Sequence, residues 1–176
     1  AFIPWYDKIT SKFPINADVA IGFDCANKQR LEIDSDIVMV NIDHHQTNDF
    51  FGNVNLVDQN AISTTQVVYD YFVANGIKMN AKMALALYAG LVDDTECFSS
   101  LNCTSSVFAM ASDLINKGAD HSSCIEWLYQ RSSLASLRAK AHLFREMEIK
   151  LNGNMALFYL RNETLNNTGA KINDCK

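Results

Sequence analysis

The chain has 176 residues, of which 48% are hydrophobic and 20% charged, as is typical of a soluble globular protein with one domain or one domain and part of a second. Its formal net charge of −5 argues against a duplex-DNA binder, and no apolar stretch is long enough to span a bilayer. The five cysteines follow no disulfide or Cys-x-x-Cys pattern, which indicates reduced thiols and a cytoplasmic location.

Two short apolar runs, residues 17–23 and 37–42, predict parallel strands buried on both faces, because they are rich in β-branched residues and bounded by polar ones. Asp24 follows the first run directly, and Asp43-His44-His45 follows the second. Ligands of open α/β sheets bind beyond the carboxyl ends of the strands. We therefore expect these polar side chains to lie at a binding site.

The residues that follow predict mainly helices. Residues 46–60 are expected to form a polar loop. Ser63 and Gln66 have the spacing of a capping box, which predicts a helix from there to about Ala74, and Asn80 is expected to cap the next helix. The remaining expected elements are helices at 104–117, 120–130 and 134–149, a strand at 155–160 and a poorly ordered polar tail at 161–176.

These elements predict an α/β fold in which a mostly parallel sheet is flanked by helices. A first domain is expected over residues 1–132, a long connecting helix over 133–152, and the beginning of a second α/β domain over 153–176. One strand at the end of the chain cannot complete a domain, because it leaves its edges unpaired and its faces uncovered.

Three clusters carry the candidate chemistry: Asp24, the Asp43-His44-His45 triplet, and Asp93-Asp94-Thr95 near the end of the second predicted helix. Carboxylates and imidazoles together suit Mn²⁺, Zn²⁺ or Fe²⁺, and a carboxylate-rich set also accepts Mg²⁺. Each cluster alone is a weak signal, since an Asp after a strand is usually a turn or a helix cap. Their order and their apolar lead-ins together indicate a metal site that activates water against a phosphate ester.

The motifs resemble those of the DHH family of phosphoesterases over about residues 17–150. The family's third motif region is similar to IVMVNIDHH followed by QTNDFFGNVNLVDQNAISTTQVVYDYF, its second motif to FDCANKQRLE and its fourth to ALYAGLVDDTECF. The similarity is greatest to the branch that degrades short oligoribonucleotides and dephosphorylates 3′-phosphoadenosine 5′-phosphate.

The resemblance implies a role for individual residues. Asp24, His44 and Asp94 would be metal ligands, with Asp24 bridging two ions. Asp43 would orient His44, and His45 would contact the substrate phosphate or assist proton transfer, so Asp43 and His45 are the candidate catalytic residues. Mn²⁺ is the expected cofactor, with Mg²⁺ and Fe²⁺ as alternatives. Asn48, Ser63 and Thr64 match family positions near the substrate. For Ser63, a role as helix cap explains the residue equally well.

Parts of the family pattern are not found in these 176 residues. The first motif, which supplies one His and two Asp, has no counterpart before Asp24, and the Gly-rich, His-containing motif of the second domain is also missing. We therefore expect a fragment with one metal site partly built, weak metal affinity and little activity by itself. A smaller departure is Glu96, which stands where many relatives have Gly.

The predicted function is a cytoplasmic, metal-dependent phosphoesterase that acts on short oligoribonucleotides or 3′-phosphoadenosine 5′-phosphate through metal-activated water. Its partner would be a short RNA or nucleotide rather than duplex DNA or a membrane, and a homodimer is left open. One alternative is a DHH enzyme acting on cyclic-dinucleotide products, pyrophosphate or polyphosphate. The other is a non-catalytic nucleotide-binding or regulatory protein.

Overall fold

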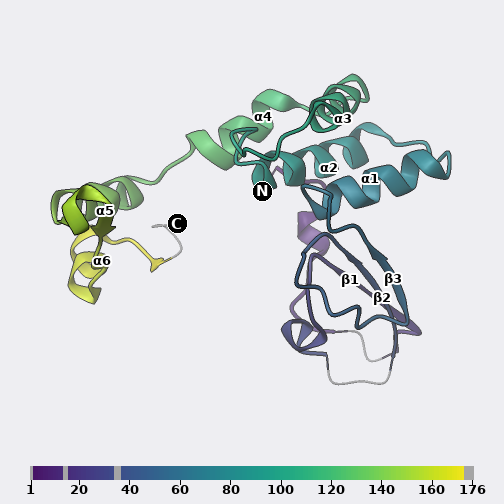
Figure 1. The fold of residues 1–176 in the computed structure, drawn as a ribbon, viewed down its shortest axis with the longest axis horizontal. Helices are drawn as coiled ribbons and strands as arrows, with labels where there is room; N and C mark the ends of the chain where they lie inside the picture. The colour runs from purple at the N-terminus through teal and green to yellow at the C-terminus, as the bar shows by residue number, and fades with distance from the viewer. Residues whose placement is uncertain (1, 14–15, 34–36, 173–176) are drawn as a thin grey trace. The chain divides into compact units, whose positions relative to one another are not determined.

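The computed structural model describes residues 2–13, 16–33 and 37–172. The chain divides into two compact units, with the division between Leu128 and Tyr129 (Figure 1). The domain limits expected at residues 132 and 152 stay a prediction. No helix in the described ranges is long and apolar enough to cross a membrane.

The first unit contains a three-stranded parallel sheet with the order β1-β2-β3, which confirms the predicted fold class (Figure 1). Its strands are β1 (Val19–Phe23), β2 (Val38–Asp43) and β3 (Val54–Val57). Phe23 pairs with Ile42, and Asp43 pairs with Val57. β3 lies inside the segment predicted as a loop, because its four residues are too few to distinguish a strand by pattern.

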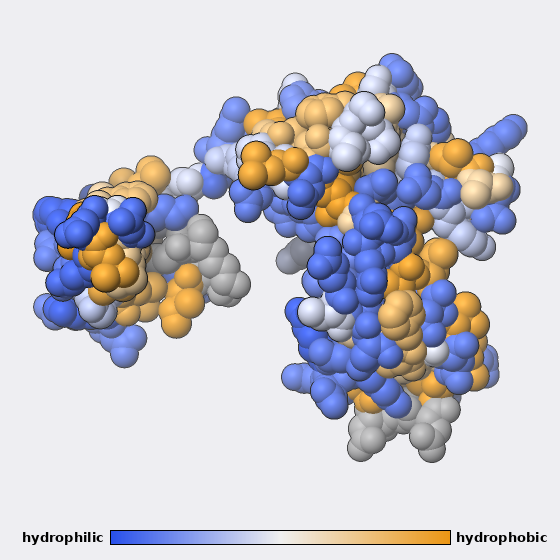
Figure 2. All heavy atoms as spheres, viewed as in Figure 1, coloured by the Kyte–Doolittle hydropathy of each residue, from blue (hydrophilic) through white to orange (hydrophobic). Residues whose placement is uncertain are grey.

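The prediction that the strands are buried on both faces is wrong for β1. Its side chains alternate, so that Ala20 is buried whereas Val19, Ile21 and Phe23 are 50%, 54% and 52% exposed. This is the period of two that any strand imposes on its side chains. Figure 2 shows apolar residues at the surface over the strands. The described residues thus cover one face of β1 and leave the other open to solvent.

Four helices follow in the first unit: α1 (Thr64–Ala74), α2 (Ala81–Asp94), α3 (Ser105–Asn116) and α4 (His121–Ile125). A π-helical turn, η3 (Glu126–Gln130), continues α4, and short 3₁₀ turns lie at η1 (Tyr6–Lys8) and η2 (Lys28–Leu31). The predicted caps are present, since Ser63 accepts from Gln66 N and Asn80 accepts from Lys82 N. The side chain of Gln66 accepts from Ile62 N rather than Ser63 N, so the capping box is shifted by one residue.

Helix α2 is the centre of the helical core, and α1 and α3 pack against it. Leu91 and Val92 are fully buried, and Tyr88 is 1% exposed. Gly90 permits the close approach of α1, because a methyl group at this position would lie 2.4 Å from Cγ2 of Thr65. The amino end of α1 and the carboxyl end of α2 both carry predicted site residues, so this contact helps to position the site.

The second unit consists of α5 (Leu134–Arg145), β4 (Glu148–Lys150), η4 (Leu151–Gly153), β5 (Met155–Leu157) and α6 (Asn162–Thr168). Helix α5 ends before residue 149, the predicted limit, because β4 and β5 form an antiparallel hairpin. Asn152 and Gly153 have φ of 53° and 91°, the left-handed conformation that tight hairpin turns require. The expected disorder of the tail is wrong for α6, and residues 173–176 lie outside the described ranges.

Candidate metal centre

The structure brings together four of the predicted site residues. Asp24, Asp43, His44 and His45 each offer one ligand atom, and these atoms all lie within 4.8 Å of one another. The cluster forms at the carboxyl ends of β1 and β2, where Asp24 N still donates to Ile42 O at 3.0 Å. Asp24 has a φ of 56°, the left-handed region in which Asp is one of the better tolerated residues.

His44 presents one ring nitrogen to this cluster. Its Nδ1 lies 3.2 Å from the carbonyl oxygen of Ala61, which can only accept a hydrogen bond. In the neutral ring the proton therefore sits on Nδ1, and Nε2 carries the free lone pair. That Nε2 lies 3.5 Å from Asp24 Oδ1, so an imidazole nitrogen and a carboxylate oxygen face the same small volume. Asp24 Oδ1 also accepts from Thr64 Oγ1 at 2.8 Å.

Asp43 holds a different histidine from the one that we expected. Its carboxylate is fully buried and accepts from His45 Nδ1 at 2.7 Å and from Asn48 Nδ2 at 2.6 Å, whereas His44 is held by Ala61. Burial acts to raise the pKa of Asp43. Hydrogen bonds from His45, Asn48 and the backbone outweigh it, and the pKa lies below its usual value. Asp43 is therefore a carboxylate at neutral pH.

Asp94 approaches from the end of α2 and stands outside the four-residue cluster. It lines a cavity of about 700 Å³ together with His44 and His45. Partial desolvation and then the negative charge of Asp24 raise the pKa of Asp94, while His44 opposes the shift. A bound cation would offset the negative charge that makes Asp94 harder to ionise.

The remaining lining of the cavity is neutral. None of the described residues that line it is Lys or Arg, and four of them carry carboxamides: Gln46, Gln59, Asn60 and Asn102. A phosphate group in this cavity would therefore find no fixed positive charge on these side chains. Only a bound cation or a protonated histidine could neutralise it there.

The other predicted residues are buried. Ser63, with no exposed surface, caps α1, and Thr64 donates to Asp24. Asn48 is 7% exposed and lies against Asp43 rather than in the cavity. Asn41 was not among the residues predicted from the sequence, and its Nδ2 donates to Asn48 Oδ1 at 3.0 Å. A polar residue inside the apolar run of β2 was the available signal.

The turn after Asp94 explains why Gly would suit position 96, where this chain has Glu. Three consecutive residues, Glu96, Cys97 and Phe98, have φ of 49°, 58° and 61°. This conformation costs an L-residue about 1–2 kcal/mol and suits Gly. Hydrogen bonds from Phe98 N to Thr95 Oγ1 and from Cys97 N to Val92 O hold the turn. A glycine at position 96 would therefore adopt the observed backbone with less strain.

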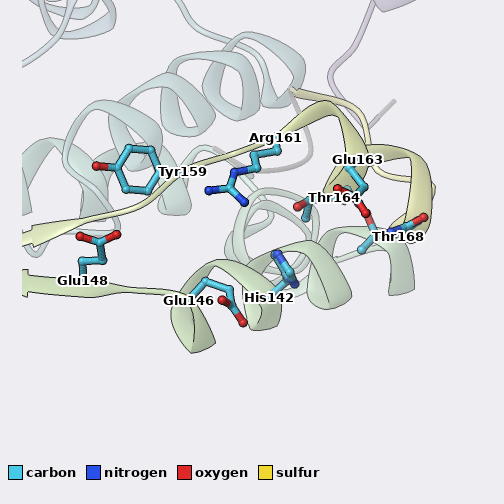
Figure 3. A pocket seen from close by; sticks show the side chains of 9 residues that line it. His142, Glu146, Glu148, Tyr159, Arg161, Glu163, Thr164 and Thr168 are labelled. Carbon is cyan, nitrogen blue, oxygen red and sulfur yellow. The ribbon is translucent and has the colours of Figure 1, made fainter.

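A second pocket, of about 300 Å³, lies in the second unit (Figure 3). Its lining combines one guanidinium, from Arg161, and one imidazole, from His142, with three carboxylates, from Glu146, Glu148 and Glu163. The mixed charge does not define one class of ligand. None of the predicted site residues lies in this pocket.

Comparison with known proteins identifies relatives of the chain. No family model matches it. It is 28% identical over 162 residues to the bifunctional oligoribonuclease and PAP phosphatase NrnA of Bacillus subtilis, a match that covers 89% of this chain and 51% of the relative. The NrnA of Thermus thermophilus is 31% identical over 114 residues, which cover 64% of this chain and 35% of the relative.

The solved structures agree on the fold. An exopolyphosphatase-related protein from Bacteroides fragilis superposes with a TM-score of 0.84 at 22% identity, over 92% of this chain and 50% of that one. By fold and by the cluster at its strand ends, the first unit is an α/β domain built around a candidate metal centre. These relatives and the shared fold support a DHH-family phosphoesterase, as the motifs indicated. The chain spans about half the length of the Bacillus relative.

Proposed function

We propose that this chain carries a metal-binding part of the active site of a phosphoesterase that hydrolyses short oligoribonucleotides or 3′-phosphoadenosine 5′-phosphate. The observation that carries the proposal is the convergence of Asp24, His44 and His45 at the strand ends, beside a cavity that Asp94 also lines. The relatives are named for these two substrates, which favours them over pyrophosphate and polyphosphate.

The donor set fits a divalent cation. Asp24 and Asp94 offer carboxylate oxygens, and His44 offers the lone pair of Nε2. Mixed carboxylate and imidazole ligands favour Mn²⁺, with Mg²⁺ and Fe²⁺ as alternatives. When bound, the ion supplies Lewis-acid chemistry, which polarises a phosphoryl oxygen and lowers the pKa of a water molecule.

The other side chains have separate tasks in this proposal. His45 donates from Nδ1 to Asp43, which leaves Nε2 to take a proton from, or give one to, a group in the cavity. The carboxamides that line the cavity suit a neutral sugar and base. A cytoplasmic location rests on the cysteines, since all four in the described ranges are free. Exclusion of duplex DNA rests on the net charge of −5, and the oligomeric state stays open.

Binding of Mn²⁺ to the chain, measured by calorimetry, tests the metal site. Asp24→Asn and Asp94→Asn should each lower the affinity by about tenfold or more, because each removes a ligand charge. Asp93→Asn is the matched control, since it makes the same change at the exposed neighbour of Asp94. Equal affinities in Asp94→Asn and Asp93→Asn would show that Asp94 is not a ligand.

Hydrolysis by the full-length protein tests the activity, since little activity is expected of these 176 residues alone. The panel is a diribonucleotide, 3′-phosphoadenosine 5′-phosphate, pyrophosphate and polyphosphate, each with and without Mn²⁺. We expect release of mononucleotide from the first or of phosphate from the second, lost in Asp94→Ala and retained in Asp93→Asn. Unchanged turnover in Asp94→Ala would refute its role. Nucleotide binding without any hydrolysis would favour the non-catalytic alternative.

A further inference from the structure

We propose that Asn48 is a positioning residue that orients the Asp43–His45 pair, with Asn41 as its buried support. Asn48 resembles a substrate-proximal residue in sequence, but the hydrogen bonds around it assign a different task. This inference rests on the proposed function, because it gives Asn48 a role within the same site.

The orientation of the Asn48 amide is fixed by one backbone group. Phe50 N lies 2.7 Å from one side-chain atom of Asn48, and a backbone N–H can only donate. That atom is therefore the oxygen, and the NH₂ group faces Asp43 Oδ2 at 2.6 Å. The same logic orients Asn41, whose NH₂ group must face Asn48 Oδ1 at 3.0 Å. The direction of the whole chain of hydrogen bonds follows from Phe50 N.

Asn48 has no hydrogen-bonding capacity left for a substrate. Its oxygen accepts from Phe50 N and Asn41 Nδ2, and its nitrogen donates to Asp43 Oδ2 and, at 3.3 Å, to Cys25 O. An asparagine side chain offers two acceptor and two donor positions, and all four are used. The residue is also only 7% exposed. Contact with a substrate would break one of these bonds.

The four bonds connect the segments that carry the metal centre. Cys25 follows Asp24 at the end of β1, Asn41 and Asp43 belong to β2, and Phe50 lies in the loop that leads to β3. Asn48 therefore ties the ends of two neighbouring strands together beneath the cluster. Asn41 is fully buried behind it, and among the described residues its Oδ1 has no hydrogen-bond partner.

The consequence is a defined state of His45. Because Asn48 occupies Oδ2, Asp43 turns Oδ1 toward His45 Nδ1, at 2.7 Å. A carboxylate that accepts from Nδ1 keeps the proton there, and Nε2 is left as the reactive nitrogen. Thr64 Oγ1 lies 3.5 Å from the same Oδ1, at the limit of a hydrogen bond, so it adds little. Asn48 is thus the main neutral group that sets the rotation of the Asp43 carboxylate.

The test compares Asn48→Ala with Asn55→Ala. Asn55 is the matched control, because its side chain also bridges backbone groups of the same loop, at Gly52 N and Gly52 O, without contact to Asp43. Nitrogen NMR of the His45 ring in the metal-free chain at pH 8 reports its tautomer. We expect the Nδ1–H form in the wild type and in Asn55→Ala, and a mixture in Asn48→Ala. An unchanged tautomer in a folded Asn48→Ala overturns the proposal.

Hydrolysis kinetics of the full-length protein give a second readout. A positioning role predicts that kcat falls by about 10- to 100-fold with little change in KM. A rise in KM with unchanged kcat would instead identify Asn48 as a substrate contact and overturn the proposal. Should Asn48→Ala fail to fold, Asn41→Leu is tested by the same measurements, since it removes the donor to Asn48 and keeps a similar side-chain volume. The tautomer and kcat should then change in the same direction. If neither changes in Asn41→Leu, the proposal is overturned.

The two proposals fail in different ways. A wild-type chain that binds no Mn²⁺ contradicts the proposed function, whatever the tautomer of His45. Normal Mn²⁺ binding with a His45 tautomer unaffected by loss of the Asn48 side chain contradicts only this inference. Mn²⁺ binding with a changed tautomer supports both.

Discussion

The contact between α1 and α2 at Gly90 gives a quantitative test of how the site is held. A methyl group at Gly90 would lie 2.4 Å from Cγ2 of Thr65. Non-bonded carbon atoms are normally about 3.5–4.0 Å apart. Gly90→Ala must therefore push the helices apart or rotate the stiff, β-branched Thr65. Thr64, which donates to Asp24, directly precedes Thr65, so the displacement would reach the metal centre.

Two opposing effects set the magnitude. Replacing Gly by Ala inside a helix stabilises by about 1 kcal/mol, whereas overpacking a core costs about 1–3 kcal/mol. Gly90→Ala should thus lower the free energy of unfolding by up to about 2 kcal/mol. In a Thr65→Ala background the nearest remaining atom of residue 65 is Cβ, at 3.4 Å, an ordinary contact. There the same substitution should raise the free energy of unfolding by about 1 kcal/mol.

The assay is a double-mutant cycle in urea followed by tryptophan fluorescence. Both tryptophans, Trp5 and Trp127, lie in the first unit, so the signal reports the unfolding of that unit. The interaction free energy between residues 65 and 90 should be about 1–3 kcal/mol. If Gly90→Ala changes stability by the same amount in both backgrounds, the steric argument is refuted.

Three further predictions concern backbone strain, close packing and charge. In urea titrations, the free energy of unfolding of Glu96→Gly should exceed that of Glu96→Ala by about 1 kcal/mol, because only Gly adopts the left-handed backbone without strain. Equal stabilities of the two variants would contradict this. Gly52→Ala should destabilise by more than about 1 kcal/mol, because its Cβ would lie 2.6 Å from a backbone oxygen of β3, and an unchanged melting temperature would disprove it. Lys117 and then Tyr69 hold the pKa of Asp113 below its usual value, so the stability that Asp113 adds is present above its unfolded pKa and is lost as pH falls through its folded pKa. The stability advantage of wild type over Asp113→Asn should therefore shrink below about pH 4, and a difference that is constant from pH 7 to pH 3 would refute the linkage.

The sequence predicted the convergence of the site because strand ends are visible in it. Asp24 and Asp43 each follow an apolar run, and parallel strands bring their carboxyl ends to one edge. The partner of Asp43 could not be predicted, because His44 and His45 both follow it within two residues and either ring could reach its carboxylate. Only the fold brings the carbonyl of Ala61 to His44 and leaves Asp43 to His45.

Other differences between the sequence predictions and the structure have similar causes. Asn48 has two donors and two acceptors, and which groups they meet depends on a loop conformation that pattern does not encode. Strand β3 is too short for periodicity to identify. Helix α5 ends at Arg145 rather than at residue 149, because residues 148–150 pair with β5 instead of continuing the helix.

The open face of the sheet has a consequence for the behaviour of the chain in solution. Val19, Ile21 and Phe23 of β1 are each about half exposed, and Val38 and Val54 on the neighbouring strands are 49% and 58% exposed. Apolar patches of this kind attract one another between molecules. Repulsion between chains of net charge −5 opposes that attraction, but salt screens the repulsion. Colloidal stability should therefore decline as ionic strength and protein concentration rise, and aggregation should be least in dilute, low-salt buffers.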